Sequence, residues 1–265
     1  MSIVFENSNI FSEEQSRSLF SKVLIFSQIS GVLAFLCAAY WMGSFEDGGY
    51  SWSDDPEKQF HYHPTFMTMG FIFMYGESII IYRALRNEPK RVTKLAHLCI
   101  HTMVIIFVLV ALKAALDSHD YHKDAQGNLD PIPNYVSLHS WIGASIILAY
   151  IGQYAVAFYT FFIPGARQST RQYLMPLHQL FGLVIFIIVS INALVGISER
   201  AAWKHTCWTK DKELCGKQFI SNLLGICIIC YCGSIVVIVA NPRWKRRPLP
   251  EEETLHRLSE LENTS

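Results

Sequence analysis

Six apolar segments of membrane-spanning length constrain the fold of this chain more than any other feature. They lie near residues 23–45, 63–83, 95–116, 138–163, 176–198 and 218–240. About 20 residues, at about 1.5 Å of helical rise per residue, span the roughly 30 Å hydrocarbon core of a bilayer. Hydrophobic residues make up 51% of the chain, and no long polar insertion separates the segments. The sequence therefore predicts an all-α membrane protein, a bundle of six transmembrane helices.

The same pattern predicts the domain organisation. One membrane domain, residues 23–240, lies between a polar N-terminal segment, residues 1–22, and a C-terminal tail, residues 241–265. The N-terminal segment lacks the short apolar core and the small-residue cleavage site of a signal peptide. The formal net charge is zero, so the composition gives no reason to expect nucleic-acid binding. The expected environment is a lipid bilayer.

Lysine and arginine are distributed unequally between the two ends of the predicted bundle. The terminal segments and the loops at 83–94 and 164–175 hold 14 of them, and the opposite end holds 7. Because basic residues favour cytosolic loops, we expect a multi-pass protein with both termini in the cytosol. The loop at 199–217 is an exception, since it holds five basic residues at the non-cytosolic end. It also holds Cys207 and Cys215, which could form a disulfide in an oxidising compartment.

Four of the apolar segments have a histidine near one end. His63 and His139 lie near the non-cytosolic ends of the second and fourth segments, and His97 and His178 lie near the cytosolic ends of the third and fifth. Ionisable residues inside membrane segments are costly and mark functional sites. Two facing imidazoles are the axial ligands of a b-type haem suited to electron transfer. We therefore predict two haems, held between helices 2 and 4 and between helices 3 and 5.

The identity of one ligand stays open at this point. His101 follows His97 by four residues and lies on the same helical face, so it could be the ligand instead or a supporting partner of the ligand. Covalent c-type haem is not expected, because the chain has no CxxCH sequence.

Two other interpretations of the histidines remain. They could be packed, hydrogen-bonded side chains without a cofactor. They could also belong to a haem-free metal transporter, which would usually hold carboxylates at the same depth as the histidines. Within the six segments the only acidic residue is Glu77, in the middle of the second segment.

The residues around these histidines resemble the cytochrome b561 family of ascorbate-dependent transmembrane electron carriers. The matching stretches are His63-Pro64 with GESIIIYR (76–83), KRVTKLAHLCIH (90–101), SLHSW (137–141), LMPLHQLFG (174–182) and PRWKRRP (242–248). The resemblance covers roughly residues 23–248. It implies six helices, two non-covalent b haems and a homodimer. It also implies that His63 pairs with His139, and His97 with His178.

The resemblance further implies an enzyme, a transmembrane ascorbate-dependent oxidoreductase with a site at each face. Its cytosolic ascorbate site falls on Lys90, Lys94 and Arg171, with Arg83 nearby. Ascorbate is a monoanion at neutral pH, so basic side chains suit its oxygens, although cytosolic anchoring alone would also place basic residues there.

The implied acceptor on the other side is monodehydroascorbate or ferric iron. A family histidine that helps hold the acceptor falls on His119, and the loop after it adds His122. Imidazoles in this loop could contact a metal ion transiently, or the loop could simply be solvated. The alternative functions are a ferric reductase that uses another donor and a haem-free metal transporter.

Overall fold

The computed structural model of the protein describes residues 12–45, 48–52, 54–204 and 207–254. Six helical segments in this part of the chain are long and apolar enough to span a membrane, which confirms the predicted six-helix bundle. The helices are α1 (Glu13–Ser44), α2 (Pro56–Phe60), α3 (Tyr62–Phe66), α4 (Tyr75–Ala84), α5 (Lys90–Asp120), α6 (Leu138–Ala157), α7 (Gln168–Lys204) and α8 (Gly216–Ala240). The π-helical segments are η1 (Met67–Met74), η2 (Phe158–Phe162) and η3 (Cys207–Asp211), and η4 (Pro242–Trp244) is a 3-10 helix. The outer parts of the two predicted terminal segments, residues 1–11 and 255–265, lie outside the described residues.

Several helices extend beyond the apolar segments that predict them. Helix α1 begins at Glu13, inside the predicted polar N-terminal segment. Ser12 starts it with a capping box, because its hydroxyl accepts from the Gln15 backbone N–H while the Gln15 side chain accepts from the Ser12 N–H. Helix α7 continues past both predicted ends and contains Pro176. Hydrophobicity marks the part of a helix in lipid, and capping chemistry sets where the helix ends.

The second membrane span is built from α2, α3, η1 and α4 in succession. A π turn holds an extra residue, so it changes which side chains of the following helix face which neighbours. Beyond η1, the Glu77 carboxylate accepts hydrogen bonds from Gln28 of α1 (2.8 Å) and from the Tyr231 hydroxyl of α8 (2.9 Å). The acidic residue in the middle of this span is therefore bonded between α1, α4 and α8.

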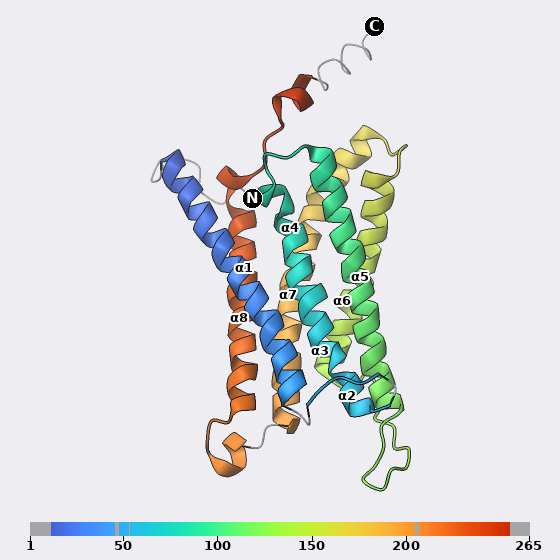
Figure 1. The fold of residues 1–265 in the computed structure, drawn as a ribbon. Helices are drawn as coiled ribbons and strands as arrows, with labels where there is room; N and C mark the ends of the chain where they lie inside the picture. The colour runs from blue at the N-terminus through green and yellow to red at the C-terminus, as the bar shows by residue number, and fades with distance from the viewer. Residues whose placement is uncertain (1–11, 46–47, 53, 205–206, 255–265) are drawn as a thin grey trace.

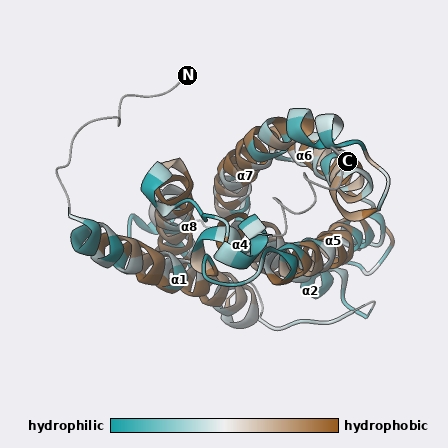
Figure 2. Ribbon diagram, turned by 90° about the horizontal axis from the view of Figure 1, so that it is seen from above, coloured by the Kyte–Doolittle hydropathy of each residue, from teal (hydrophilic) through white to brown (hydrophobic). Residues whose placement is uncertain are grey.

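The four membrane spans that carry the paired histidines surround a common centre. Seen from above, α4, α5, α6 and α7 form a ring, and α8 and α1 lie outside it (Figure 2). Helix α1 packs along α8, which also contacts α4 and α7, while α6 packs along α7 and α5 packs against α3, η1 and α4. Helices pack in lipid through close side-chain contact, because lipid tails are as apolar as the helices themselves.

Both described ends of the chain lie at the same end of the bundle (Figure 1). Trp244 of η4 is buried and donates a hydrogen bond from its indole N–H to the Ser16 hydroxyl of α1, at 3.2 Å. Its ring also packs edge-on against Phe20, with 5.4 Å between the ring centres. These contacts hold the start of α1 and the segment after α8 together.

The loops at the opposite end are tied to one another. Cys207 and Cys215 form a disulfide before α8, with their Cα atoms 6.1 Å apart. The Glu57 carboxylate of α2 lies 3.1 Å from the Lys204 ammonium and 3.7 Å from Nδ1 of His122. Glu57 therefore links the end of α7 to the loop that follows α5.

Candidate functional site

The structure brings the four histidines together as two pairs. The ring centres of His63 (α3) and His139 (α6) are 6.1 Å apart, and those of His97 (α5) and His178 (α7) are also 6.1 Å apart. Metal–imidazole bonds of about 2 Å on both sides of one metal ion place the two ring centres roughly 6 Å apart. Each pair therefore has the spacing expected of two axial ligands of one iron.

Hydrogen bonds orient three of these four rings. The Nδ1 atoms of His63, His97 and His139 lie 3.2, 2.9 and 2.9 Å from the backbone carbonyl oxygens of Ala111, Ser78 and Asn192, respectively. Because a carbonyl oxygen only accepts, Nδ1 must carry the proton in each ring. The Nε2 atom then has a free lone pair, which is the arrangement of a histidine that binds a metal.

The fourth ring differs, because Nδ1 of His178 is buried and has no hydrogen-bond partner in the described part of the chain. The packing around His139 also fits a flat cofactor held by these rings. Gly196 of α7 lies directly against the His139 imidazole, and a Cβ atom at this position would come within 2.6 Å of the ring. Glycine therefore gives His139 the room to lie where it does. The spacing, the Nδ1 contacts and this close approach together fit a b-type haem at each pair.

His101, the alternative ligand, has different contacts. Its Nδ1 lies 2.7 Å from the Tyr150 hydroxyl, and its ring also packs edge-on against Tyr75, at 5.3 Å between centres. The ring centre is 4.5 Å from that of His97. The structure therefore pairs His97 with His178 at ligand spacing and places His101 beside them, against α6.

Three of the four basic residues predicted for ascorbate lie near one another. Lys90 and Lys94 occupy the first turns of α5, Arg171 occupies the first turn of α7, and Lys94 is close enough to both to interact electrostatically. Nε of Arg171 is buried without a hydrogen-bond partner among the described residues. A buried donor without an acceptor is costly, so this cluster is suited to an anionic ligand that supplies oxygen acceptors.

Arg83, the fourth of these residues, bonds to α8. Its guanidinium group donates to the backbone carbonyls of Val239 and Asn241, both at 2.6 Å. These carbonyls belong to the end of α8, where helical acceptors have no partner within the helix. Arg83 therefore joins α4 to the end of α8, a role that its position in the sequence does not reveal.

The two histidines predicted for the acceptor are separated. His119 lies in the last turn of α5, has its Nδ1 2.9 Å from the Asn134 side-chain oxygen, and is close enough to His63 to interact electrostatically. His122 instead faces Glu57. Within the described residues, no group of three or more His, Cys, Asp and Glu side chains is arranged to hold a metal ion. Of these two, His119 is therefore the one that interacts with a residue of a histidine pair.

The tail contacts helix α5, which the sequence does not indicate. The Glu252 carboxylate accepts a hydrogen bond from the Lys90 backbone N–H at 2.7 Å and two from the Arg246 guanidinium at 2.8 and 2.9 Å. Arg246 also donates to the Glu88 carbonyl. The hydrogen bonds from Arg246, with that from Lys90, lower the pKa of Glu252 to about 2. The tail therefore folds over the N-terminus of the helix that carries Lys90 and Lys94.

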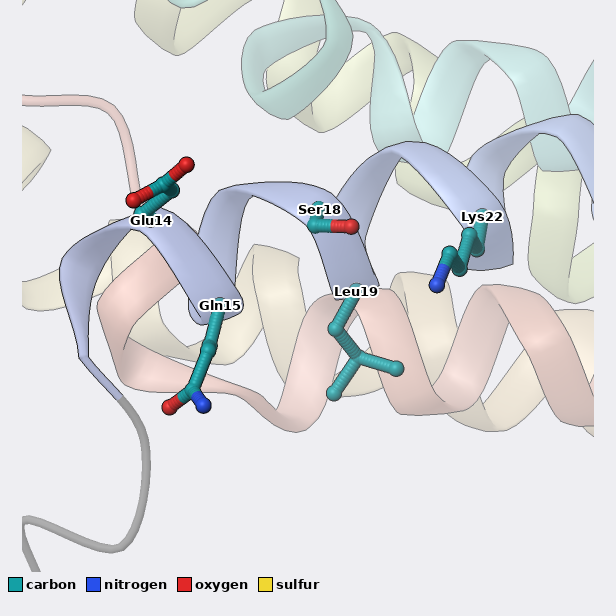
Figure 3. Close-up of a pocket in the computed structure, with 5 residues that line it drawn as sticks. All are labelled: Glu14, Gln15, Ser18, Leu19 and Lys22. Atoms are coloured by element: carbon teal, nitrogen blue, oxygen red, sulfur yellow. The ribbon is translucent and has the colours of Figure 1, made fainter.

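A depression on the surface of α1 lies apart from these sites. It is lined by residues of that helix alone, namely Glu14, Gln15, Ser18, Leu19 and Lys22 (Figure 3). None of the four paired histidines is on α1, so this hollow does not contribute to either pair.

Comparison with known proteins agrees with the histidine motifs. A family model described as eukaryotic cytochrome b561 matches residues 62–204, which include both histidine pairs. A Caenorhabditis elegans protein named as a homolog of the transmembrane ascorbate-dependent reductase CYB561 is 49% identical, with 100% of both chains covered. The human transmembrane ascorbate-dependent reductase CYB561 is 34% identical, with 87% of this chain and 86% of the relative covered. The Xenopus tropicalis plasma membrane ascorbate-dependent reductase CYBRD1 is 33% identical, with 89% of this chain and 79% of the relative covered. The chain therefore belongs to the eukaryotic cytochrome b561 family, as its histidine motifs predict.

Proposed function

We propose that this membrane oxidoreductase transfers single electrons from cytosolic ascorbate, through two b haems, to an acceptor on the other side of the membrane. The observation that carries the proposal is the presence of two histidine pairs with the same 6.1 Å spacing, drawn from four different helical segments. Membership of the cytochrome b561 family implies b-type haem, and the three relatives named above are ascorbate-dependent reductases.

His63 with His139 would hold one haem, and His97 with His178 would hold the other. Haem supplies a one-electron ferric–ferrous couple when it is bound. Two imidazoles per iron leave no open coordination position, which favours electron transfer over oxygen chemistry. The chain itself fixes the proton on Nδ1 of three of the rings through the carbonyls of Ala111, Ser78 and Asn192. It thereby fixes which nitrogen faces the cofactor.

Lys90, Lys94 and Arg171 would bind ascorbate at the end of the bundle that carries the termini. Charge-assisted hydrogen bonds from ammonium and guanidinium groups match the oxygens of a monoanion. Oxidation of ascorbate to monodehydroascorbate releases one electron and one proton, and the electron would pass to the haem of His97 and His178. The adjoining positive charges favour the anionic form of the bound donor, from which an electron leaves more readily.

At the other end, His119 would contact the acceptor, because it lies close enough to His63 to interact with it electrostatically. The acceptor is monodehydroascorbate or ferric iron, either of which takes up one electron. We also propose that both termini face the cytosol and that the protein is a homodimer. The described chain ends share one end of the bundle, which supports equal orientation of the termini.

Haem content and ascorbate kinetics test this function. Purified protein should contain two b haems per chain, and stopped-flow mixing with ascorbate should reduce both. A chain with one haem, or with none, would contradict the two-site arrangement. Protein that holds two haems but is reduced only by another donor would support the ferric reductase alternative.

A further inference from the structure

The four paired histidines differ in what their outer ring nitrogen contacts. Nδ1 of His63 and Nδ1 of His139 each meet a single backbone carbonyl. Nδ1 of His178 has no hydrogen-bond partner in the described part of the chain. Nδ1 of His97 meets two acceptors, and one of them is a side chain. Backbone carbonyls are present whatever the residue, so only His97 has an Nδ1 contact that depends on side-chain identity.

That side chain is Ser78 of α4, which is fully buried. Its hydroxyl oxygen lies 3.0 Å from Nδ1 of His97, and its own carbonyl oxygen lies 2.9 Å from the same atom. The hydroxyl also lies 3.4 Å from the His97 carbonyl, to which it can donate its proton. The Ser78 hydroxyl can therefore give its proton to the His97 backbone and accept the Nδ1 proton at the same time.

We propose that the Ser78 hydroxyl is a positioning group for the haem of His97 and His178, which fixes the plane of the His97 ring and sets the reduction potential of that haem. The inference rests on the proposed haem ligands and goes beyond them. Acceptors at Nδ1 make a ligating imidazole more basic, and a more basic ligand stabilises ferric over ferrous iron. Because the partner ligand His178 lacks such an acceptor, the basicity of this pair depends mainly on His97.

The substitution Ser78→Ala tests the inference without removing the carbonyl acceptor. One of the two acceptors disappears, so His97 becomes less basic and the ferrous form of this haem is stabilised relative to the ferric form. We expect the ratio of ferrous to ferric iron at a fixed ambient potential to rise about threefold for one haem only. That change corresponds to about +28 mV, since a tenfold change in a one-electron couple is 59 mV.

Potentiometric titration followed by optical and electron paramagnetic resonance spectra provides the readout. The low-spin ferric signal depends on the angle between the two imidazole planes, so a freed His97 ring should also shift that signal for the same haem. Ser78→Thr keeps the hydroxyl and should restore both the midpoint potential and the ferric signal of this haem. Ser234→Ala is the matched control, because the buried Ser234 hydroxyl donates to the Cys230 carbonyl of its own helix, at 2.7 Å.

The outcomes separate this inference from the proposed function. Two haems in Ser78→Ala, with both midpoints and both ferric signals equal to those of Ser234→Ala, would overturn the role of Ser78 and leave the two-haem function intact. Wild-type protein that binds fewer than two haems would overturn the proposed function, and this inference with it. A shift confined to one haem, and restored by threonine, would support the role of Ser78.

Discussion

The variants His97→Ala and His101→Ala should differ in haem content, although the two substitutions change the structure in nearly the same way. Both side chains lie on α5, one turn apart, with ring centres 4.5 Å apart. Either substitution removes one imidazole from the interior at a packing cost of about 2–5 kcal/mol. A difference in haem content between the two variants therefore reports coordination, because the loss of packing is similar in both.

The geometry sets the expected size of the difference. His97 lies 6.1 Å from His178, the same spacing as in the other pair, so His97→Ala removes one of two iron ligands and should leave about one haem per chain. His101 instead bonds to the Tyr150 hydroxyl. Loss of a residue next to a metal ligand typically lowers affinity by about 10–100-fold. A tightly held haem survives such a change, so His101→Ala should still contain two.

Haem per polypeptide, measured from the absorbance of the extracted pyridine complex against protein concentration, checks this prediction. The spectrum of the remaining haem in His97→Ala should match that of the His63 and His139 pair, which can be identified from His139→Ala. If His101→Ala loses one haem while His97→Ala keeps two, the pairing that we infer from the ring spacing is wrong.

Three further predictions concern the two faces of the bundle and the tail. Lys94→Ala should raise the ascorbate concentration for half-maximal reduction about tenfold at constant haem content. Arg86→Ala is the control and should not raise it, because the Arg86 guanidinium packs 4.8 Å from the ring centre of Phe20. Equal kinetics in the two variants would show that Lys94 does not bind ascorbate. His119→Ala should slow electron transfer to ferric acceptors without slowing reduction by ascorbate, and His122→Ala serves as its control. Normal ferric reduction in His119→Ala would show that His119 has no role in transfer to the acceptor. The pKa of Glu252 is lowered from 4.5 to about 2, so its contribution to docking of the tail is complete above pH 4.5 and is lost as the pH falls toward 2. Glu252→Gln should accordingly increase amide exchange in residues 249–254 at neutral pH, and unchanged exchange would show that the carboxylate does not hold the tail.

The number of helices and the histidine pairs could be predicted from sequence because both depend on depth in the bilayer. A segment of about 20 apolar residues has few alternatives to a spanning helix, and a histidine at a given end of such a segment is thereby assigned to one face. Helix ends were less predictable. The start of α1 depends on the Ser12 capping box, and the polar ends of α7 carry no hydrophobic signal.

Apart from the histidine pairs, contacts between segments far apart in the chain could not be predicted. Arg83 and Lys94 look alike in the sequence, as basic residues at one membrane face. Arg83 nevertheless binds carbonyls of residues 239 and 241, and only the packing of α4 against α8 decides this. The bond from Lys90 to Glu252 joins residues 162 positions apart. Such pairings follow from the folded arrangement of the helices, which a single sequence with no internal repeat does not specify.

Electron transfer across sealed vesicles tests the central claim most directly. Vesicles that contain the purified protein in one orientation are loaded with ascorbate, and a membrane-impermeant ferric chelate is added outside. We predict that the outer acceptor is reduced only when both histidine pairs are intact, and that His139→Ala and His178→Ala each abolish transfer. Reduction of the outer acceptor by either single-pair variant at the wild-type rate would contradict a two-haem path through the membrane.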